Sequence, residues 1–396
     1  MNKRNLFSFV WLLALGTVFL PAQTKQAKKI GDFIESTSYN EHKRGAERTL
    51  QYYPEGDDFV CINGKNRFTR ALYGSWSPFR LETSDRPVFA AYDKRNSKHI
   101  RFLLQGKGLS VALDSIEFCE ARYTAGRRTY LLKDAALGKG TLSVSVLVFP
   151  DADGAVWKFS AKDLAEDMVL RCFISEIRAK KLSRNGDMGA DPPGCFEAPE
   201  KPQMQKVYDL PLTDEAYLVL ENLDLKLVSL DEGRRLYQKA EDARKVLASR
   251  IRFTTPDPYF NTLGGALAVA ADGIWDGQVW LHGAVGWRMP LSGWRAAYTG
   301  DALGWHDRAR KHFDAYAASQ VTDVPNTIPH PAQDSALHLA RSVKKWGTPQ
   351  YSNGYICRNP RRNNQMHHYD MNLCYIDELL WHFNWTGDWE YARQMW

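Results

Sequence analysis

The stretch Thr299-Gly300-Asp301, which returns as Thr386-Gly387-Asp388, decides the fold that this sequence predicts. Each copy follows an aromatic-rich helical pattern and precedes a new amphipathic segment. Glycine accepts the left-handed backbone that ends a helix, and aspartate accepts hydrogen bonds from the free N–H groups of the next helix. Each copy therefore predicts a tight helix–turn–helix, and its recurrence predicts a stack of helical hairpins.

Apolar residues recur at spacings of three and four throughout the last third of the chain, as expected for amphipathic helices. One stripe contains Phe260, Leu263 and Leu267, and another contains Leu373, Ile376 and Leu380. A third stripe runs between them, over 302–316. The chain stops inside the helix expected after the second Thr-Gly-Asp, so residues 256–396 predict the first hairpins of an incomplete helical domain, truncated at its C-terminus.

Before residue 229 the apolar period is two, which is typical of strands. Residues 141–149 and 155–161 alternate on either side of the turn at 150–154 and predict a β-hairpin. Many short strands without helices between them predict an antiparallel β-sandwich over residues 30–228. A stripe of Leu236, Ala240, Ala243, Leu247 and Ile251 predicts a linker helix within 229–255.

The N-terminus has the layout of a secretory signal peptide, residues 1–22, with Lys3 and Arg4 before an apolar run that ends at Leu20. The sequence thus predicts a periplasmic or secreted protein with no stable membrane span after cleavage. The net charge is +6 with both signs interspersed, and no basic run is present, so nucleic acid is not an expected partner. Six widely spaced cysteines leave disulfide pairing open.

Residues 271–290 form the densest cluster of chemistry-bearing side chains, which includes Asp272, Asp276, His282, Trp287 and Arg288, spaced by glycines. Glycine lets the backbone approach a ligand closely, and arginine can donate two hydrogen bonds at once to a carboxylate or to hydroxyls. The cluster predicts a pocket lining, extended by Trp294 and Arg295. The alternatives are that the two aspartates cap a helix end or a turn, and that the arginines stack on tryptophan within a hairpin.

A second candidate cluster lies at 363–373, where His367, His368, Tyr369 and Asp370 precede a helical pattern. In a pocket, Asp370 would serve as acid, base or substrate clamp, whereas as an N-cap it would only hold backbone N–H groups. No spacing of histidines and carboxylates is diagnostic of a metal, so neither a metal nor a cofactor is predicted.

The order of parts, a signal peptide, a sandwich, a linker helix and Thr-Gly-Asp hairpins, resembles the six-hairpin glycosidases, whose catalytic domain is an (α/α)6 barrel behind a sandwich. In related enzymes an aspartate near a helix start lies about sixteen residues before such a turn, as Asp370 lies before Thr386. The sequence is also similar to exported polysaccharide-degrading enzymes of glycoside hydrolase family 142, which implies β-L-arabinofuranosidase activity.

These patterns together predict an exported glycoside hydrolase, or its N-terminal part, that acts on plant-derived or other complex oligo- and polysaccharides. Asp370, Asp272 and Asp276 are its candidate catalytic carboxylates, because glycoside cleavage needs two carboxyl groups. His282, Trp287, Arg288, Trp294, Arg295, His367, His368 and Tyr369 are its candidate sugar-binding residues. The alternatives are a polysaccharide lyase with Tyr369 or His368 as base and Arg361 beside the uronate, and a non-catalytic glycan-binding protein.

Overall fold

The computed structural model describes residues 52–65, 68–93, 96–106, 108–164, 168–177, 201, 204–283, 288–290, 296–320, 322, 333–334, 339–340, 354–357, 359–361 and 369–396. The predicted signal peptide therefore lies outside the described residues. No helix within these ranges has the length and apolar character that crossing a membrane requires.

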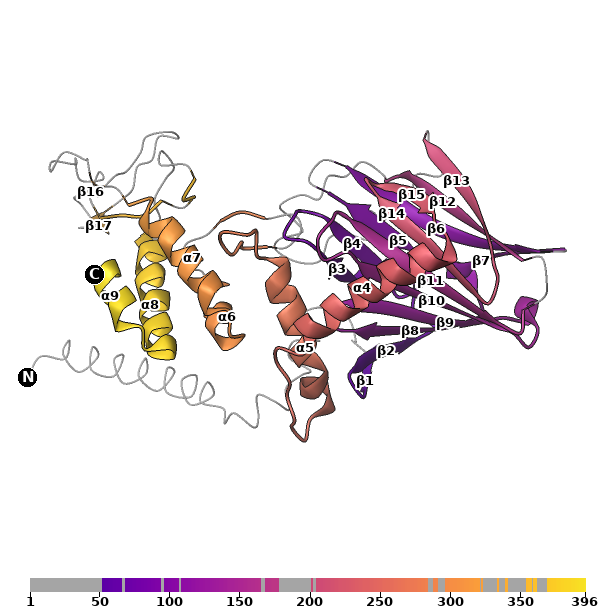
Figure 1. Ribbon diagram of the computed structural model, residues 1–396, viewed down its shortest axis with the longest axis horizontal. Coiled ribbons are helices and arrows are strands. Elements are labelled where there is room, and N and C mark those ends of the chain that lie inside the picture. The colour runs from indigo at the N-terminus through magenta and orange to yellow at the C-terminus, as the bar shows by residue number, and fades with distance from the viewer. Residues whose placement is uncertain are drawn as a thin grey trace, which may run out of the picture. The chain divides into compact units, whose positions relative to one another are not determined.

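The first half of the described chain forms two antiparallel sheets (Figure 1). The larger one has eight strands in the order β1-β2-β8-β9-β10-β11-β14-β15. Its strands are β1 (Tyr53–Glu55), β2 (Asp58–Ile62), β8 (Phe118–Thr124), β9 (Arg127–Lys133), β10 (Thr141–Val148), β11 (Gly154–Lys162), β14 (Glu215–Glu221) and β15 (Asp224–Leu227).

The second sheet has seven strands in the order β13-β12-β6-β5-β4-β3, with β7 also paired to β6. Its strands are β3 (Phe68–Tyr73), β4 (Arg80–Ser84), β5 (Phe89–Tyr92), β6 (Ser97–Gly106), β7 (Leu109–Ala112), β12 (Val169–Glu176) and β13 (Gln205–Pro211). Short 3₁₀ turns, η1 (Leu113–Ser115) and η2 (Ala135–Leu137), lie beside the sheets, and β16 (Gln333–Asp334) pairs with β17 (Leu339–Ala340).

The β-hairpin predicted from alternation is confirmed, because β10 pairs with β11 in a register that places Val146 opposite Trp157. Leu142, Val144 and Val146 are fully buried, while the serines between them are partly exposed. One face of β10 therefore packs into the protein interior, as a period of two requires.

Aromatic rings from both sheets meet in the core. Trp157 of β11 lies 5.4 Å from Phe89 of β5, and Phe102 of β6 lies 5.3 Å from Phe159 of β11, both in edge-to-face contacts. All four side chains are fully buried. Aromatic pairs of this geometry contribute about 0.5–1.5 kcal/mol beyond their burial, so these contacts hold the sheets face to face.

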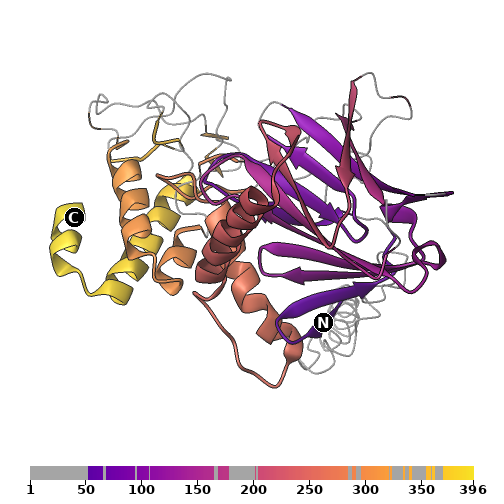
Figure 2. The same cartoon turned by 45° about the vertical axis from the view of Figure 1, so that its right-hand side comes forward.

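Helix α4 (Leu230–Ala248) begins at the N-cap Ser229, whose hydroxyl accepts from the Glu232 N–H. It crosses the outer face of the eight-stranded sheet, where Ala240 packs with Leu147, Val156 and Val219 (Figure 2). The apolar stripe predicted from the sequence thus faces the sheet. Glu241, which follows Ala240 in the chain, is also buried and ion-pairs with Arg127 at 2.9 Å and Arg244 at 2.7 Å.

Within the described residues five more helices follow: α5 (Pro258–Gly273), α6 (Ala296–Ala302), α7 (His306–Ala317), α8 (Tyr369–Thr386) and α9 (Trp389–Met395). Asp257 caps α5 by accepting from the Tyr259 N–H, and Pro258 occupies its first turn. Proline is tolerated there because that N–H has no partner inside the helix. A second core, which includes Trp280, Phe313, Tyr316 and Tyr375, holds these helices together.

The two Thr-Gly-Asp copies have different structures. Gly387 has φ +66° and Asp388 caps α9 by accepting from the Tyr391 N–H at 2.9 Å, as predicted. In the first copy, Gly300 and Asp301 lie inside α6, and the left-handed residue is Gly304 instead, with φ +72°. The first copy therefore does not make the predicted turn, and a Cβ on Gly300 would lie 2.2 Å from the Trp280 ring.

The prediction of an incomplete (α/α)6 barrel of six-hairpin type is wrong. The described chain is dominated by the two sheets, and the few helices after them form no barrel of helical hairpins. A ring of paired helices buries each apolar stripe against the next pair, whereas Phe260 and Leu267 of α5 and Leu373 and Ile376 of α8 are 49–70% exposed.

Candidate functional site

A cavity of about 260 Å³, hereafter the junction cavity, opens where α4, α5 and α7 meet the sandwich. Its wall includes Trp76, Arg244, Arg250, Asp272, Trp305 and Arg308. These side chains come from the β3–β4 loop, the end of α4, the end of α5 and the start of α7. The cavity therefore depends on contacts between segments that are more than 200 residues apart in the chain.

Arg308 is the central side chain of the junction cavity. Its guanidinium lies 2.7 Å from the Asp272 carboxylate, and only 15% and 12% of these two side chains are exposed. The same guanidinium stacks on the Trp305 ring, with its Cζ 4.2 Å from the ring centroid, and lies 5.3 Å from the Trp76 ring. An arginine held by a carboxylate and by aromatic faces is fixed in orientation, which preorganises the wall.

Trp76 supplies an aromatic surface at the cavity. Its side chain is 48% exposed, although one edge packs on Trp275 with ring centroids 6.5 Å apart. An exposed tryptophan face binds the flat apolar face of a sugar ring, and its indole N–H keeps a hydrogen-bond donor available.

Arg250 follows the C-terminus of α4 and is exposed. Its guanidinium donates to the Leu303 carbonyl at 3.1 Å and lies 4.9 Å from the Trp305 centroid. Among the described residues no carboxylate ion-pairs with Arg250, whereas Arg244 pairs with Glu241 and Arg308 with Asp272. Arg250 is therefore the cation of this wall that is best placed to meet an anionic group of a ligand.

Two arginines fix the end of α5 where Asp272 lies. Arg80 of β4, which is fully buried, and Arg288 both donate to the Gly273 carbonyl, and Arg288 also donates to the Trp76 carbonyl at 2.9 Å. Burial, and then the nearby charge of Arg288, lower the pKa of Arg80 to about 9, and burial lowers the pKa of Arg288. Cationic groups near the C-terminus of a helix complement its dipole, so this pair holds Asp272 in place.

The structure separates the three predicted catalytic carboxylates. Asp272 lines the junction cavity, and Asp276 binds the Gln278 and Val279 N–H groups of its own turn and ion-pairs with Arg361 at 2.7 Å. Asp370 is exposed in the first turn of α8 and is not part of the cavity wall. The turn-capping alternative thus describes Asp276.

The predicted sugar-binding residues divide into described and undescribed ones. Arg288 serves two backbone carbonyls, and the His282 N–H donates to the Met289 carbonyl at 3.0 Å within the hairpin after α5. Trp287, Trp294, Arg295, His367 and His368 lie outside the described residues, as does the side chain of Tyr369. Their roles stay predictions.

The site residues predicted from the sequence did not include Trp76, Arg250, Trp305 or Arg308. Trp305 and Arg308 follow the first Thr-Gly-Asp within seven residues, a local signal that could have found them. No local pattern marks Trp76 or Arg250, because only the tertiary fold brings them together.

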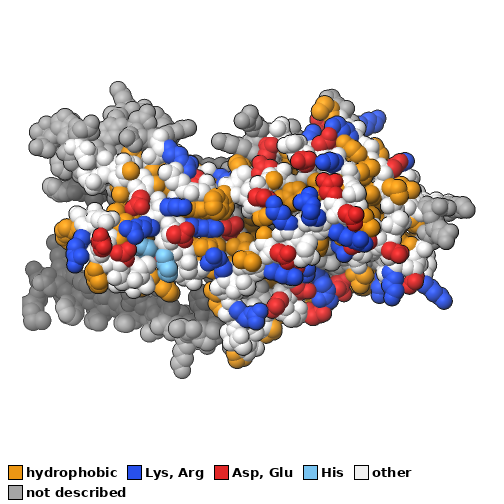
Figure 3. Space-filling model, in the orientation of Figure 1, with side chains coloured by type: hydrophobic (Ala, Val, Ile, Leu, Met, Phe, Trp, Pro, Cys, Tyr) orange, Lys and Arg blue, Asp and Glu red, His pale blue; other side chains and the backbone are white. Residues whose placement is uncertain are grey.

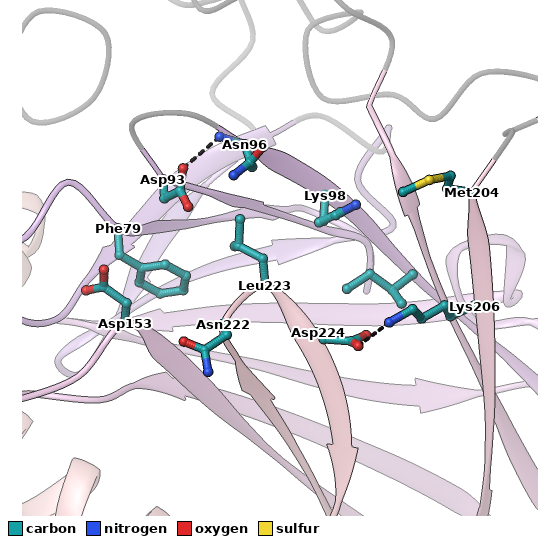
Figure 4. A pocket seen from close by; sticks show the side chains of 11 residues that line it. Phe79, Asp93, Asn96, Lys98, Asp153, Met204, Lys206, Asn222, Leu223 and Asp224 are labelled. Atoms are coloured by element: carbon teal, nitrogen blue, oxygen red, sulfur yellow. Dashed lines mark hydrogen bonds and ion pairs between the residues drawn. The ribbon is translucent and has the colours of Figure 1, made fainter.

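A second cavity, of about 480 Å³, opens on the sandwich, where the β5–β6 loop, β13 and the β14–β15 turn contribute to its lining (Figure 4). Several of its polar groups are already bound: Lys206 pairs with Asp224, Asp93 accepts from the Asn96 N–H, and Asp153 accepts from Ser75 and Ser77 outside the cavity. Its aromatic residue, Phe79, is only 1% exposed. This cavity offers no open ring face, so we favour the junction cavity as the functional site.

The fold and the junction cavity define a β-sandwich protein followed by a short helical region, with an arginine- and tryptophan-lined site between them. A family model described as a domain of unknown function (DUF4450) matches residues 96–218, from β6 to β14. This match lies within the sandwich, covers well under half of the chain and carries no activity. No curated protein matches the chain.

Proposed function

We propose that this protein binds glycans in the junction cavity and that it prefers anionic ones. The observation that carries the proposal is that the half-exposed Trp76 and the exposed Arg250 line the same cavity. The ring provides a stacking surface for a sugar, and the guanidinium provides a bidentate partner for a uronate carboxylate or a sulfate.

Binding of a panel of oligosaccharides tests this proposal. Neutral and uronate-containing oligosaccharides of equal length are titrated into the full chain by isothermal calorimetry at low and high salt. We expect the uronate-containing oligosaccharides to bind more tightly than the neutral ones. In Arg250→Met the ratio of the two affinities should fall about tenfold, which corresponds to roughly 1.4 kcal/mol.

Arg235→Met is the matched control, because Arg235 is an exposed arginine of α4, the helix that precedes Arg250, and does not line the cavity. Equal losses in the two variants, or no binding by any oligosaccharide, would contradict the proposal.

Glycoside hydrolysis at the same site is the second candidate function, and the carboxylate of Asp272 in the cavity wall favours it. Two carboxyl groups are needed for this reaction, and Asp272 is the predicted catalytic carboxylate that lines the cavity. Under this hypothesis the protein is an exported glycoside hydrolase, and Asp272 serves as base or nucleophile.

Release of new reducing ends from the bound oligosaccharide tests for hydrolysis. If the protein is a hydrolase, Asp272→Asn abolishes this release, while Asp307→Asn, which changes an exposed aspartate, retains it. An unsaturated product that absorbs ultraviolet light would indicate a lyase instead, and binding without any product would leave recognition as the function.

A further inference from the structure

Three side chains that can bind a metal converge in the helical region, and none of them lines the junction cavity. Asp301 of α6, His306 at the start of α7 and His382 of α8 each present one ligand atom, and these atoms lie within 4.8 Å of one another. The Asp301 Oδ1 lies 2.7 Å from the His306 Nδ1 and 2.9 Å from the His382 Nδ1. The Oδ1 atom of Asp301 thus lies within hydrogen-bond distance of the Nδ1 atom of both histidines.

The buried carboxylate of Asp301 needs partners that compensate its charge. Its side chain is only 3% exposed, and burial of an ionised carboxylate is unfavourable without a compensating charge. The neighbouring arginines are paired elsewhere, Arg308 with Asp272 and Arg310 with Asp388. Within the described part of the chain, the ion-pairing partners of Asp301 are the two histidines alone.

Packing fixes the inner half of this cluster and leaves the outer half open. The His382 ring lies 5.5 Å from Phe313 and 5.8 Å from Tyr391, and its side chain is 2% exposed. His306 has a 48% exposed side chain, and histidine atoms reach the surface over the helical region (Figure 3). A rigid buried pair of ligands beside an accessible third one is the arrangement of a site with open coordination positions.

We propose that Asp301, His306 and His382 bind a divalent transition metal ion, with Zn²⁺ as the ion that best fits the ligand set. Two imidazoles and one carboxylate are a ligand set of zinc sites that keep a position for water or substrate. Metal–ligand bonds of about 2.0–2.1 Å in tetrahedral geometry separate ligand atoms by roughly 3.3 Å. The Asp301 and histidine atoms need to separate by only about half an ångström to reach this geometry.

The opposing view is a metal-free hydrogen-bond network, in which both imidazoles donate Nδ1–H to Asp301 and tie α6, α7 and α8 together. The two views differ in what happens at His306. A structural network tolerates glutamine there, because its amide also donates a hydrogen bond, whereas metal affinity falls when an imidazole ligand is lost.

Cobalt titration of the full, untagged chain tests the proposal. After treatment with a chelator, Co²⁺ is added and its visible absorption is recorded, and Zn²⁺ is then added to displace it. We expect one Co²⁺ per chain with the intense bands of a four- or five-coordinate site, displacement by Zn²⁺, and at least a tenfold weaker affinity in His306→Gln.

Asp301→Asn provides a second variant that removes a charged ligand, and His99→Gln of β6 is a histidine control outside the cluster. Circular dichroism verifies that each variant is folded. Absence of a Co²⁺ spectrum in the unaltered chain, or the same affinity in His306→Gln, would overturn the proposal.

Discussion

The ion pair between Asp272 and Arg308 should contribute much more to stability than an exposed pair of equal length. The perturbation is a double-mutant cycle of Asp272→Asn, Arg308→Met and both together. The atoms lie 2.7 Å apart with side chains 12–15% exposed, so their coupling energy should be about 1.5–3 kcal/mol. The matched control is Lys239–Asp151, at 2.6 Å but 53% and 61% exposed, for which about 0.2–1 kcal/mol is expected.

The two single variants should also differ from each other. Arg308→Met removes the stacking of the guanidinium on Trp305 at 4.2 Å as well as the ion pair, whereas Asp272→Asn leaves that stacking in place. The arginine variant should therefore lose about 0.5–2 kcal/mol more. Urea denaturation midpoints measure all of these differences. Equal coupling energies for the two pairs would refute the view that Arg308 is a preorganised part of the cavity wall.

Three further changes follow from single contacts. Gly300→Ala should lower the melting temperature strongly, since its Cβ would lie 2.2 Å from Trp280. The Cβ of Gly387→Ala would meet no atom, so this variant should lose only about 1 kcal/mol of stability, through the φ of +66°. Equal losses of stability in the two variants would contradict this prediction. Asp388→Ala should destabilise α9 by about 1 kcal/mol in urea denaturation through loss of its N-cap, and no loss would contradict the cap. Burial lowers the pKa of His312 to about 3, below its value near 6.5 in the unfolded chain. The free energy of unfolding should therefore fall from pH 6.5 toward pH 3, because the unfolded state gains a proton that the folded state does not. His312→Asn should flatten that decline by up to about 1.4 kcal/mol per pH unit, and an unchanged slope would contradict this account.

Local patterns predicted the elements of this fold well. The strand alternation of β10 and β11, the apolar stripe of α4 and the cap of α9 are all set by neighbouring residues, and each is present in the structure. These features depend on periods and turn residues within a few positions of one another, which the sequence displays directly.

The pairing of helices could not be predicted in the same way. An apolar stripe such as that of α8 indicates a helix, but it does not say which element covers it, and Leu373 is 70% exposed in the structure. Asp301 carries the motif of a helix cap, yet its partner His382 lies 81 residues further along the chain. The same holds for Trp76 and Arg308, whose contact depends on the docking of the helices against the sandwich.

The junction cavity as a glycan site is tested most directly by one comparison of affinities. Trp76 and Trp381 are equally exposed, at 48% and 51%, but only Trp76 lines the cavity. The dissociation constant of the tightest oligosaccharide should rise at least tenfold in Trp76→Ala and stay unchanged in Trp381→Ala. An unchanged affinity in Trp76→Ala, or an equal loss in both variants, would contradict the account.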